Sequence, residues 1–302
     1  MLTLLGHIGR VHNVAFSPDA TLLASGSEGS TARIWNFPAG TLRHNFKIGG
    51  QPDRGMAAIA FAPDGTLFAV GAGAVRLWRV RDGTLLRVLG DTATRIISVA
   101  FAPDSRTLAA GSGGAEGRAP TINLWDAAGG QFLRTLPAQH SGAVHSLVFS
   151  PDGSLLAAGD EQVRLWGVAD GALVRTLSPQ TEAELAFSLA FSPDGTTLAA
   201  GTGDSAVRLW RVADGALLYA LVGHAAAGYV QSIAFSPDGR LLAAGLSASS
   251  AVQVWRIPEG TLVRTPEGPP GGVGGVAFSP DGAFLAWGAA DGTVCAWHLP
   301  EA

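Results

Sequence analysis

A short motif, in which phenylalanine is followed by a small residue, proline and aspartate, recurs seven times along this 302-residue chain. The copies begin at Phe16, Phe61, Phe101, Phe149, Phe191, Phe235 and Phe278, at intervals of 45, 40, 48, 42, 44 and 43 residues. Each copy is followed by a tryptophan that ends a short apolar run, at Trp35, Trp78, Trp125, Trp166, Trp210, Trp255 and Trp297. Self-similarity at this period is typical of a repeat architecture, so we expect one repeat domain over residues 1–302.

Each repeat reads as four β-strands, which we name a, b, c and d in chain order. In the first repeat the run VHNVAF ends at the Ser-Pro-Asp motif, a turn in which proline presets the second position. A second run, TLLASGS, is followed by a polar turn and by the tryptophan run ARIW. Turns such as RDG and ADG lead into a fourth run, for example TLLRVL, and Asp-Gly is a strong hairpin signal.

The repeats are not expected to fold one by one. Glycine and proline interrupt the chain too often for helices, and apolar residues rarely recur at helical spacing, so the prediction is all-β. Apolar residues make up 47% of the chain and occupy both faces of the predicted strands, so each sheet must pack between two neighbours. A closed seven-bladed β-propeller with four antiparallel strands per blade satisfies this requirement.

The two ends of the sequence predict how the ring closes. The last repeat stops after its tryptophan strand and lacks strand d, whereas a spare run precedes the first repeat. Joining HLPEA to MLTLLGH reproduces the register of RIPEGTLVRTPEG in the sixth repeat. We therefore expect residues 2–5 to complete the last blade, which removes an open sheet edge.

Composition narrows the class of protein. The net charge is -4, and the arginines are dispersed, so a nucleic-acid partner is not expected. Lys47 is the only lysine, a bias that we attribute to a bacterial, GC-rich genome. Cys295 is the only cysteine, which excludes an internal disulfide, and there is no leader-like or membrane-spanning run. We expect a cytoplasmic monomer that binds neither membrane nor cofactor.

The phenylalanine-small-Pro-Asp turn, the closing tryptophan and the period resemble the WD-repeat β-propeller family over essentially the whole chain. The dipeptide that names the family survives only as Trp125-Asp126, and its Gly-His pair only at His7 and His224, with His140 at the matching place. The family's hydrogen-bond network joins this histidine, a strand b hydroxyl, a turn aspartate and the tryptophan. The first repeat has His7, Ser25 and Trp35 but Gly29 in place of aspartate, while Asp204 and Asp291 lack the other partners. We therefore expect apolar packing to hold the blades together.

The resemblance also implies where a partner binds. The loops from d to a and from b to c vary in length, and in this family they share one face, called the top. Partner-contacting side chains lie four and six residues before the motif phenylalanine. These positions hold Arg10, His12, Arg95, Ile97, His145, Leu185, Phe187, Tyr229 and Gln231, whereas the second and seventh repeats offer only Gly55, Ala57, Gly272 and Gly274. An apolar arc with charged neighbours suits protein binding, although Leu185 and Phe187 would equally suit packing beneath the loop at 178–184.

Several alternatives remain. A metal site is disfavoured, because neither His7 with His12 nor His140 with His145 has a third ligand nearby. No nucleophile elbow, phosphate loop or zinc-protease motif occurs, so we expect no enzyme activity; His12 and His145 would be the candidate bases if the channel were catalytic. The predicted function is a protein-interaction scaffold, and the alternative is a sensory or regulatory domain of a larger bacterial signalling protein.

Overall fold

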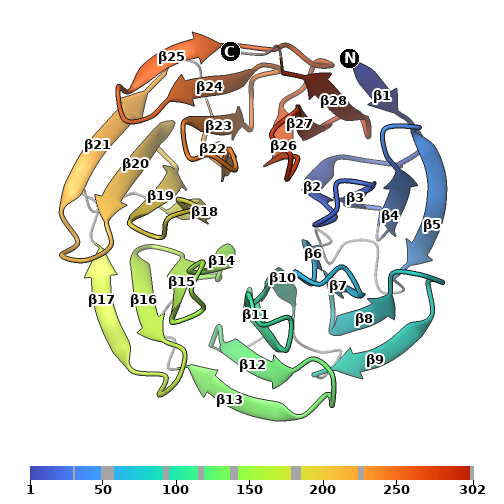
Figure 1. Ribbon diagram of the computed structural model, residues 1–302, viewed down its shortest axis with the longest axis vertical. Helices are drawn as coiled ribbons and strands as arrows, with labels where there is room; N and C mark the ends of the chain where they lie inside the picture. Colours follow the sequence, from blue (N-terminus) through green and yellow to red (C-terminus); the bar gives the residue numbers. More distant parts are fainter. Residues whose placement is uncertain are drawn as a thin grey trace.

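The computed structural model describes residues 1–29, 31–48, 58–90, 95–114, 119–136, 142–177, 185–223 and 228–299. Seven four-stranded antiparallel sheets surround a central opening (Figure 1). The all-β, seven-bladed prediction is confirmed. Within these residues, no helix has the length and apolar character needed to cross a membrane.

In each blade strand a lies nearest the opening and strand d lies at the rim (Figure 1). The a strands are β2 (Val11–Phe16), β6 (Ala58–Phe61), β10 (Ile96–Phe101), β14 (Ser146–Phe149), β18 (Ala186–Phe191), β22 (Val230–Phe235) and β26 (Val273–Phe278). The b strands are β3 (Leu22–Ser27), β7 (Leu67–Gly71), β11 (Thr107–Ser112), β15 (Leu155–Gly159), β19 (Thr197–Thr202), β23 (Leu241–Leu246) and β27 (Phe284–Ala289). The c strands are β4 (Thr31–Asn36), β8 (Val75–Arg79), β12 (Ile122–Asp126), β16 (Val163–Gly167), β20 (Ala206–Arg211), β24 (Val252–Arg256) and β28 (Val294–His298). The d strands are β5 (Thr41–Lys47), β9 (Leu85–Leu89), β13 (Phe132–Leu136), β17 (Leu173–Leu177), β21 (Leu217–Val222), β25 (Thr261–Arg264) and β1 (Leu2–Leu4).

The first strand of the chain completes the seventh blade. β1 pairs with β28 in antiparallel register, with Leu2 opposite Ala296 and Leu4 opposite Val294. Leu4 is buried, whereas Leu5 lies outside the strand and is 70% exposed. The predicted closure is confirmed, and the strand is one residue shorter than expected.

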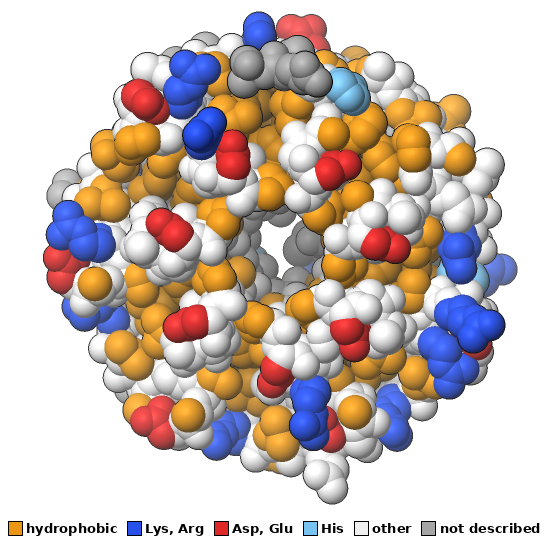
Figure 2. Space-filling model, viewed as in Figure 1, with side chains coloured by type: hydrophobic (Ala, Val, Ile, Leu, Met, Phe, Trp, Pro, Cys, Tyr) orange, Lys and Arg blue, Asp and Glu red, His pale blue; other side chains and the backbone are white. Residues whose placement is uncertain are grey.

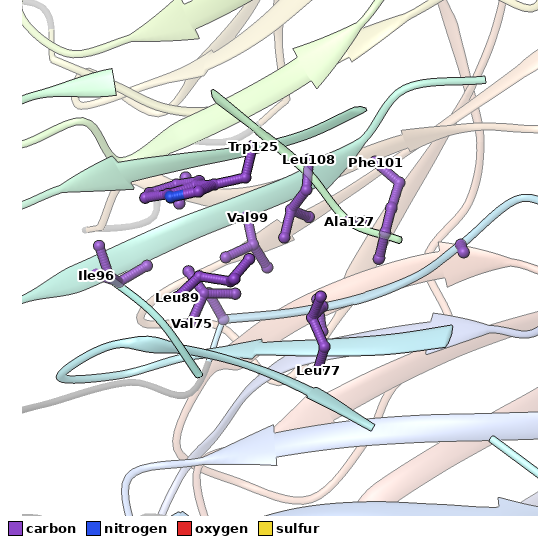
Figure 3. Packing of buried hydrophobic residues seen from close by; sticks show 13 residues of the cluster. Val75, Leu77, Leu89, Ile96, Val99, Phe101, Leu108, Trp125 and Ala127 are labelled. Atoms are coloured by element: carbon purple, nitrogen blue, oxygen red, sulfur yellow. The ribbon is translucent and has the colours of Figure 1, made fainter. Parts of the chain in front are cut away.

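Apolar packing between neighbouring blades forms the core. Between the second and third blades, Val75, Leu77 and Leu89 pack against Ile96, Val99, Phe101, Leu108 and Trp125 (Figure 3). Corresponding clusters of buried residues lie at the other blade interfaces. The closing tryptophan therefore covers the preceding blade, which explains why every repeat carries one.

Small residues on strand b allow the blades to approach closely. A Cβ added to Gly71 would lie 2.5 Å from Ile96 Cγ2, and one added to Gly288 would lie 2.5 Å from Val11 Cγ1. Such distances are far shorter than van der Waals contact, so only glycine fits here. The recurrent Ala-Ala-Gly of strand b is thus a packing requirement.

The a–b turns explain the repeated motif. In the first blade Ser17 Oγ donates to Asp19 Oδ1 at 2.6 Å and accepts from the Leu22 amide at 2.9 Å. The Thr21 amide donates to the same Asp19 oxygen at 3.1 Å. Serine and aspartate together satisfy the polar groups of the turn, which otherwise lack strand partners.

The first blade contains a buried polar network. His7 Nε2 lies 2.7 Å from Ser25 Oγ, which accepts from Trp35 Nε1 at 2.9 Å. His7 Nδ1 lies 2.9 Å from Thr31 Oγ1, so a threonine on strand c supplies the contact expected of an aspartate at Gly29. A neutral imidazole satisfies both contacts, because one ring nitrogen donates and the other accepts.

In the fifth blade, Asp204 also has partners that the sequence did not predict. It accepts from Thr202 Oγ1 at 2.6 Å and pairs with Arg208 Nη2 at 2.7 Å. Apolar packing at every interface agrees with the prediction, and these polar contacts add to it in the first and fifth blades.

Deleting residues 1–6 should lower the melting temperature by roughly 5–15 °C, because the seventh blade loses its outer strand and the buried Leu4 side chain. Thermal unfolding followed by circular dichroism measures the change. Deletion of the exposed Met1 alone is the control. An unchanged melting temperature in the longer deletion would contradict the closure.

Lowering the pH from 7 to 5 should destabilise the protein through His7. Burial, with a smaller contribution from the Arg33 charge, lowers the pKa of His7 to about 4. In the unfolded chain His7 binds a proton near pH 6.5, whereas in the folded chain it stays neutral down to about pH 4. The contribution of neutral His7 to the free energy of unfolding is therefore fully present above pH 6.5 and is lost as the pH falls toward 4. Within this window, each unit by which the pH falls lowers the free energy of unfolding by up to about 1.4 kcal/mol. Urea denaturation should show a weaker pH dependence in His7→Gln but an unchanged one in the exposed-site control His298→Gln; equal dependence in all three proteins would refute this role.

Candidate partner-binding face

The predicted site residues lie where strand a begins, at the end of each blade opposite the a–b turn. Four of them immediately precede their a strands: Arg95, His145, Leu185 and Tyr229. Phe187 lies inside β18. The remaining members are Arg10, His12, Ile97 and Gln231. All nine belong to the described residues, whereas Gly55, Ala57 and the loop at 178–184 lie outside them.

Three of these side chains form one continuous aromatic surface, which we call the aromatic arc: His145, Phe187 and Tyr229. The rings of Phe187 and Tyr229 stack with centroids 4.3 Å apart and an interplanar angle of 28°. The His145 ring lies 5.0 Å from Phe187 on its other side. The arc therefore spans the fourth, fifth and sixth blades, and each of its side chains remains partly exposed.

Hydrogen bonds fix the backbone beneath the aromatic arc. The Tyr229 amide donates to Ser247 Oγ at 3.1 Å, and the Ser247 amide donates back to the Tyr229 carbonyl at 3.0 Å. Ser205 Oγ donates to the Gly228 carbonyl, which ties the fifth blade to the sixth. A surface held in this way loses little conformational entropy when a partner binds.

The flank of the aromatic arc on the third blade is cationic. Arg95 is exposed, and burial followed by the Arg95 charge lowers the pKa of His145 below its ordinary value. His145 is therefore neutral at pH 7 and contributes an uncharged ring. Ile97 is only 6% exposed and packs close to Gly113, so it supports this flank from below. Leu185 and Gln231 are partly buried.

Arg10 and His12 are not part of the aromatic arc, although Arg10 contacts Ser247, which holds the Tyr229 backbone. Arg10 Nη2 donates to the carbonyls of Ser247 and Val273, at 3.2 and 3.1 Å, and so joins the first blade to the sixth and seventh. His12 Nε2 lies 2.7 Å from Glu28 Oε1. Burial nevertheless lowers the pKa of His12, outweighing the opposing effect of Glu28, so the neutral ring donates to the carboxylate.

The seventh blade has no side chain to offer at these positions because its backbone abuts the first and the sixth blades. A Cβ on Gly274 would lie 2.0 Å from the Val11 carbonyl oxygen, and one on Gly272 would lie 2.0 Å from the Ser247 oxygen. The glycines at these places are therefore structural.

The described residues provide little for catalysis or metal binding. They contain no group of three potential metal ligands, and His140 lies outside them. His12 on β2 and His145 beside β14 lie on opposite sides of the opening, so they do not form one catalytic pair (Figure 1). Cys295 is fully buried, and burial raises its pKa to about 11, which keeps it protonated and unreactive.

The opposite face carries a ring of carboxylates around the opening (Figure 2). The exposed aspartates of the seven a–b turns are Asp19, Asp64, Asp104, Asp152, Asp194, Asp238 and Asp281. Their oxygens accept hydrogen bonds from turn hydroxyls and amides, and in Asp152 these bonds lower the pKa of the carboxyl. The ring thus follows from seven repeated turns.

Seven four-stranded blades, each with the same turn and closing tryptophan, define a repeat propeller. The family model described as "WD domain, G-beta repeat" matches residues 1–36, 83–126, 130–167, 171–211, 215–256 and 260–298. The chain therefore belongs to the WD-repeat family. These matches omit residues 37–82, which hold most of the second blade, and the structure shows that blade to have the same four-stranded form.

Curated relatives match parts of the chain. The mouse F-box-like/WD repeat-containing protein TBL1X is 31% identical over 147 residues, which cover 44% of this chain and 27% of the relative. The rice small ribosomal subunit protein RACK1y is 30% identical over 59% of this chain and 39% of its own length. Rat apoptotic protease-activating factor 1 is 28% identical over 56% of this chain and 10% of its own. The chain thus spans well under half of each relative, and such propellers typically act as non-catalytic scaffolds for protein interactions.

Replacing Arg10 by alanine should destabilise the fold by about 1–3 kcal/mol, because two carbonyls of neighbouring blades lose a charged donor. Urea denaturation measures the loss, and the exposed Arg95→Ala serves as the control with little expected change. Unchanged stability in Arg10→Ala would mean that this side chain does not join the blades.

Proposed function

We propose that this protein is a non-catalytic interaction scaffold that binds a peptide or protein segment on its top face, at the aromatic arc. The observation that carries the proposal is the uninterrupted contact of His145, Phe187 and Tyr229 across three blades. Aromatic side chains on a rigid surface dominate binding energy at protein interfaces.

The surroundings of the aromatic arc support a polypeptide partner. Arg95 on one flank and Glu161 on the fourth blade are exposed charges, while Gln231 lies beside Tyr229 in sequence. An apolar centre with a polar rim is the usual composition of a protein-binding patch. The net charge of -4 argues against nucleic acid as the partner, and we propose that the scaffold works in the cytoplasm as a monomer.

A catalytic function has less support. The candidate bases lie across the opening from each other, and the buried Cys295 thiol stays protonated at neutral pH. Arg95 and Glu161, two charged groups of the third and fourth blades, are exposed to solvent.

Replacing Phe187 and Tyr229 by serine should weaken capture of the partner from native lysate at least about 30-fold, because each change removes a ring from the stack. Affinity capture with quantitative mass spectrometry identifies the partner, and titration of that purified partner then measures the loss. Phe132→Ser is a matched control, since this phenylalanine is 57% exposed on the rim strand β13.

Unaltered circular dichroism and melting temperature must accompany the loss in the double variant. If that folded variant captures the partner as well as the parent protein, the aromatic arc is not the binding site. If Phe132→Ser loses binding instead, the partner occupies the rim.

A further inference from the structure

A groove lies between the first and second blades, on the face that carries the a–b turns. It has a volume of about 660 Å³, and we call it the basic groove. Its apolar floor is formed by Leu22, Leu67 and Val80, and all the residues that line it belong to the described part of the chain. Hollows of about 740 and 230 Å³ lie between other blades on the same face, so the basic groove differs from them by its lining.

Three arginines line the outer end of the basic groove: Arg43 on β5, Arg79 at the end of β8, and Arg81 in the c–d turn that follows. Arg43 is the bulge residue of its d strand. The bulge positions of the next five d strands hold Leu86, Leu133, Val174, Leu218 and Val263. The turn position of Arg81 holds only alanine or proline in the other six repeats, at Pro38, Ala128, Ala169, Ala213, Pro258 and Pro300. A cation at either position is therefore confined to this groove.

Hydrogen bonds hold two of these arginines in place. Arg43 Nη2 donates to the Arg81 carbonyl at 3.2 Å, and Arg43 Nη1 donates to Asn36 Oδ1 at 3.4 Å. Arg79 Nη1 pairs with Asp82 Oδ2 at 3.0 Å. The Arg81 side chain is exposed and has no hydrogen-bond or ion-pair partner among the described residues. The outer end of the groove thus offers one free guanidinium group beside a second whose position is fixed.

The inner end of the basic groove carries the opposite charge. It is lined by Asp19 and Asp64, the exposed aspartates of two a–b turns. Figure 2 shows such carboxylates around the opening, whereas basic side chains gather at the right edge of the view, over the first and second blades. Neighbouring strands lie about 4.8 Å apart, so the two ends of the groove, two to three strands from each other, are separated by about 10–14 Å. Three to four extended residues span that length, at about 3.3 Å per residue.

We propose that the basic groove binds an extended peptide segment of a partner protein that is acidic at one end and basic at the other. Its carboxylates pair with Arg43 and Arg81, an apolar side chain lies on the floor, and its basic side chain faces the two turn aspartates. Charge complementarity carries this assignment, because guanidinium groups match carboxylates in shape and charge. A uniformly anionic partner, such as nucleic acid, would place negative charge against the aspartates. The groove lies on the opposite face from the aromatic arc, so this proposal is independent of the proposed function.

The probe is a capped peptide, Lys-Ser-Leu-Glu-Glu, and its binding to the full chain in low salt is followed by the methyl NMR signals of Val80 on the floor. We expect a saturable shift with a dissociation constant of about 1 mM or tighter. Arg43→Leu combined with Arg81→Ala introduces the residue types that other repeats carry, and should weaken binding at least about fivefold because two exposed ion pairs are lost. Arg211→Ala is the matched control and should leave binding unchanged, since Arg211 ends a c strand of the fifth blade and is 52% exposed.

Two further peptides test the order of the charges. Lys-Ser-Leu-Lys-Lys should give no measurable shift, and Glu-Ser-Leu-Glu-Glu should bind at least about threefold more weakly than the parent peptide because its first glutamate meets the turn aspartates. Circular dichroism checks the fold of the double variant, and Arg81→Ala alone, in an exposed turn, gives the same comparison if the double variant is destabilised. The proposal is overturned if the parent peptide leaves the Val80 signals unshifted or binds the arginine variants as tightly as the unaltered protein. Tighter binding of the all-acidic peptide would also overturn it, in favour of a polyanion site.

Discussion

The fold depends on the contact between neighbouring blades. A four-stranded sheet that is apolar on both faces gains its stability only when another sheet covers each face. Here the closing tryptophan reaches the preceding blade, and strand b glycines such as Gly71 let the two backbones approach without a side chain between them. Because every blade needs two neighbours, only a closed ring leaves none uncovered.

Closure of the ring then determines which surfaces differ from one another. The aromatic arc arises because three adjacent repeats carry a ring near the start of strand a, and blade packing brings these rings into contact. The opposite face is governed by the a–b turns, whose aspartates recur with the repeat. Variation at one face and uniformity at the other agree with our proposal that the varied face binds the partner.

The joint between the chain ends breaks this symmetry. β1 restores the hydrogen bonding of the last blade, and Trp297 in this blade is partly exposed, whereas the other six closing tryptophans are buried. A repeat protein closed in this way thus has one interface unlike the other six. The physical cause is chain connectivity, since the residues themselves repeat the common pattern.

The sequence by itself determined the number of blades, the order of strands within each and the use of the first residues to close the ring, because these follow from local periodicity and turn chemistry. It also placed Phe187 and Tyr229 at the same end of neighbouring blades. Only the tertiary structure decided that these rings stack with His145, that Thr31 replaces an aspartate beside His7, and that Arg10 joins blades more than two hundred residues apart. Such contacts depend on distances and directions between separate strands, which no periodic pattern along one chain records.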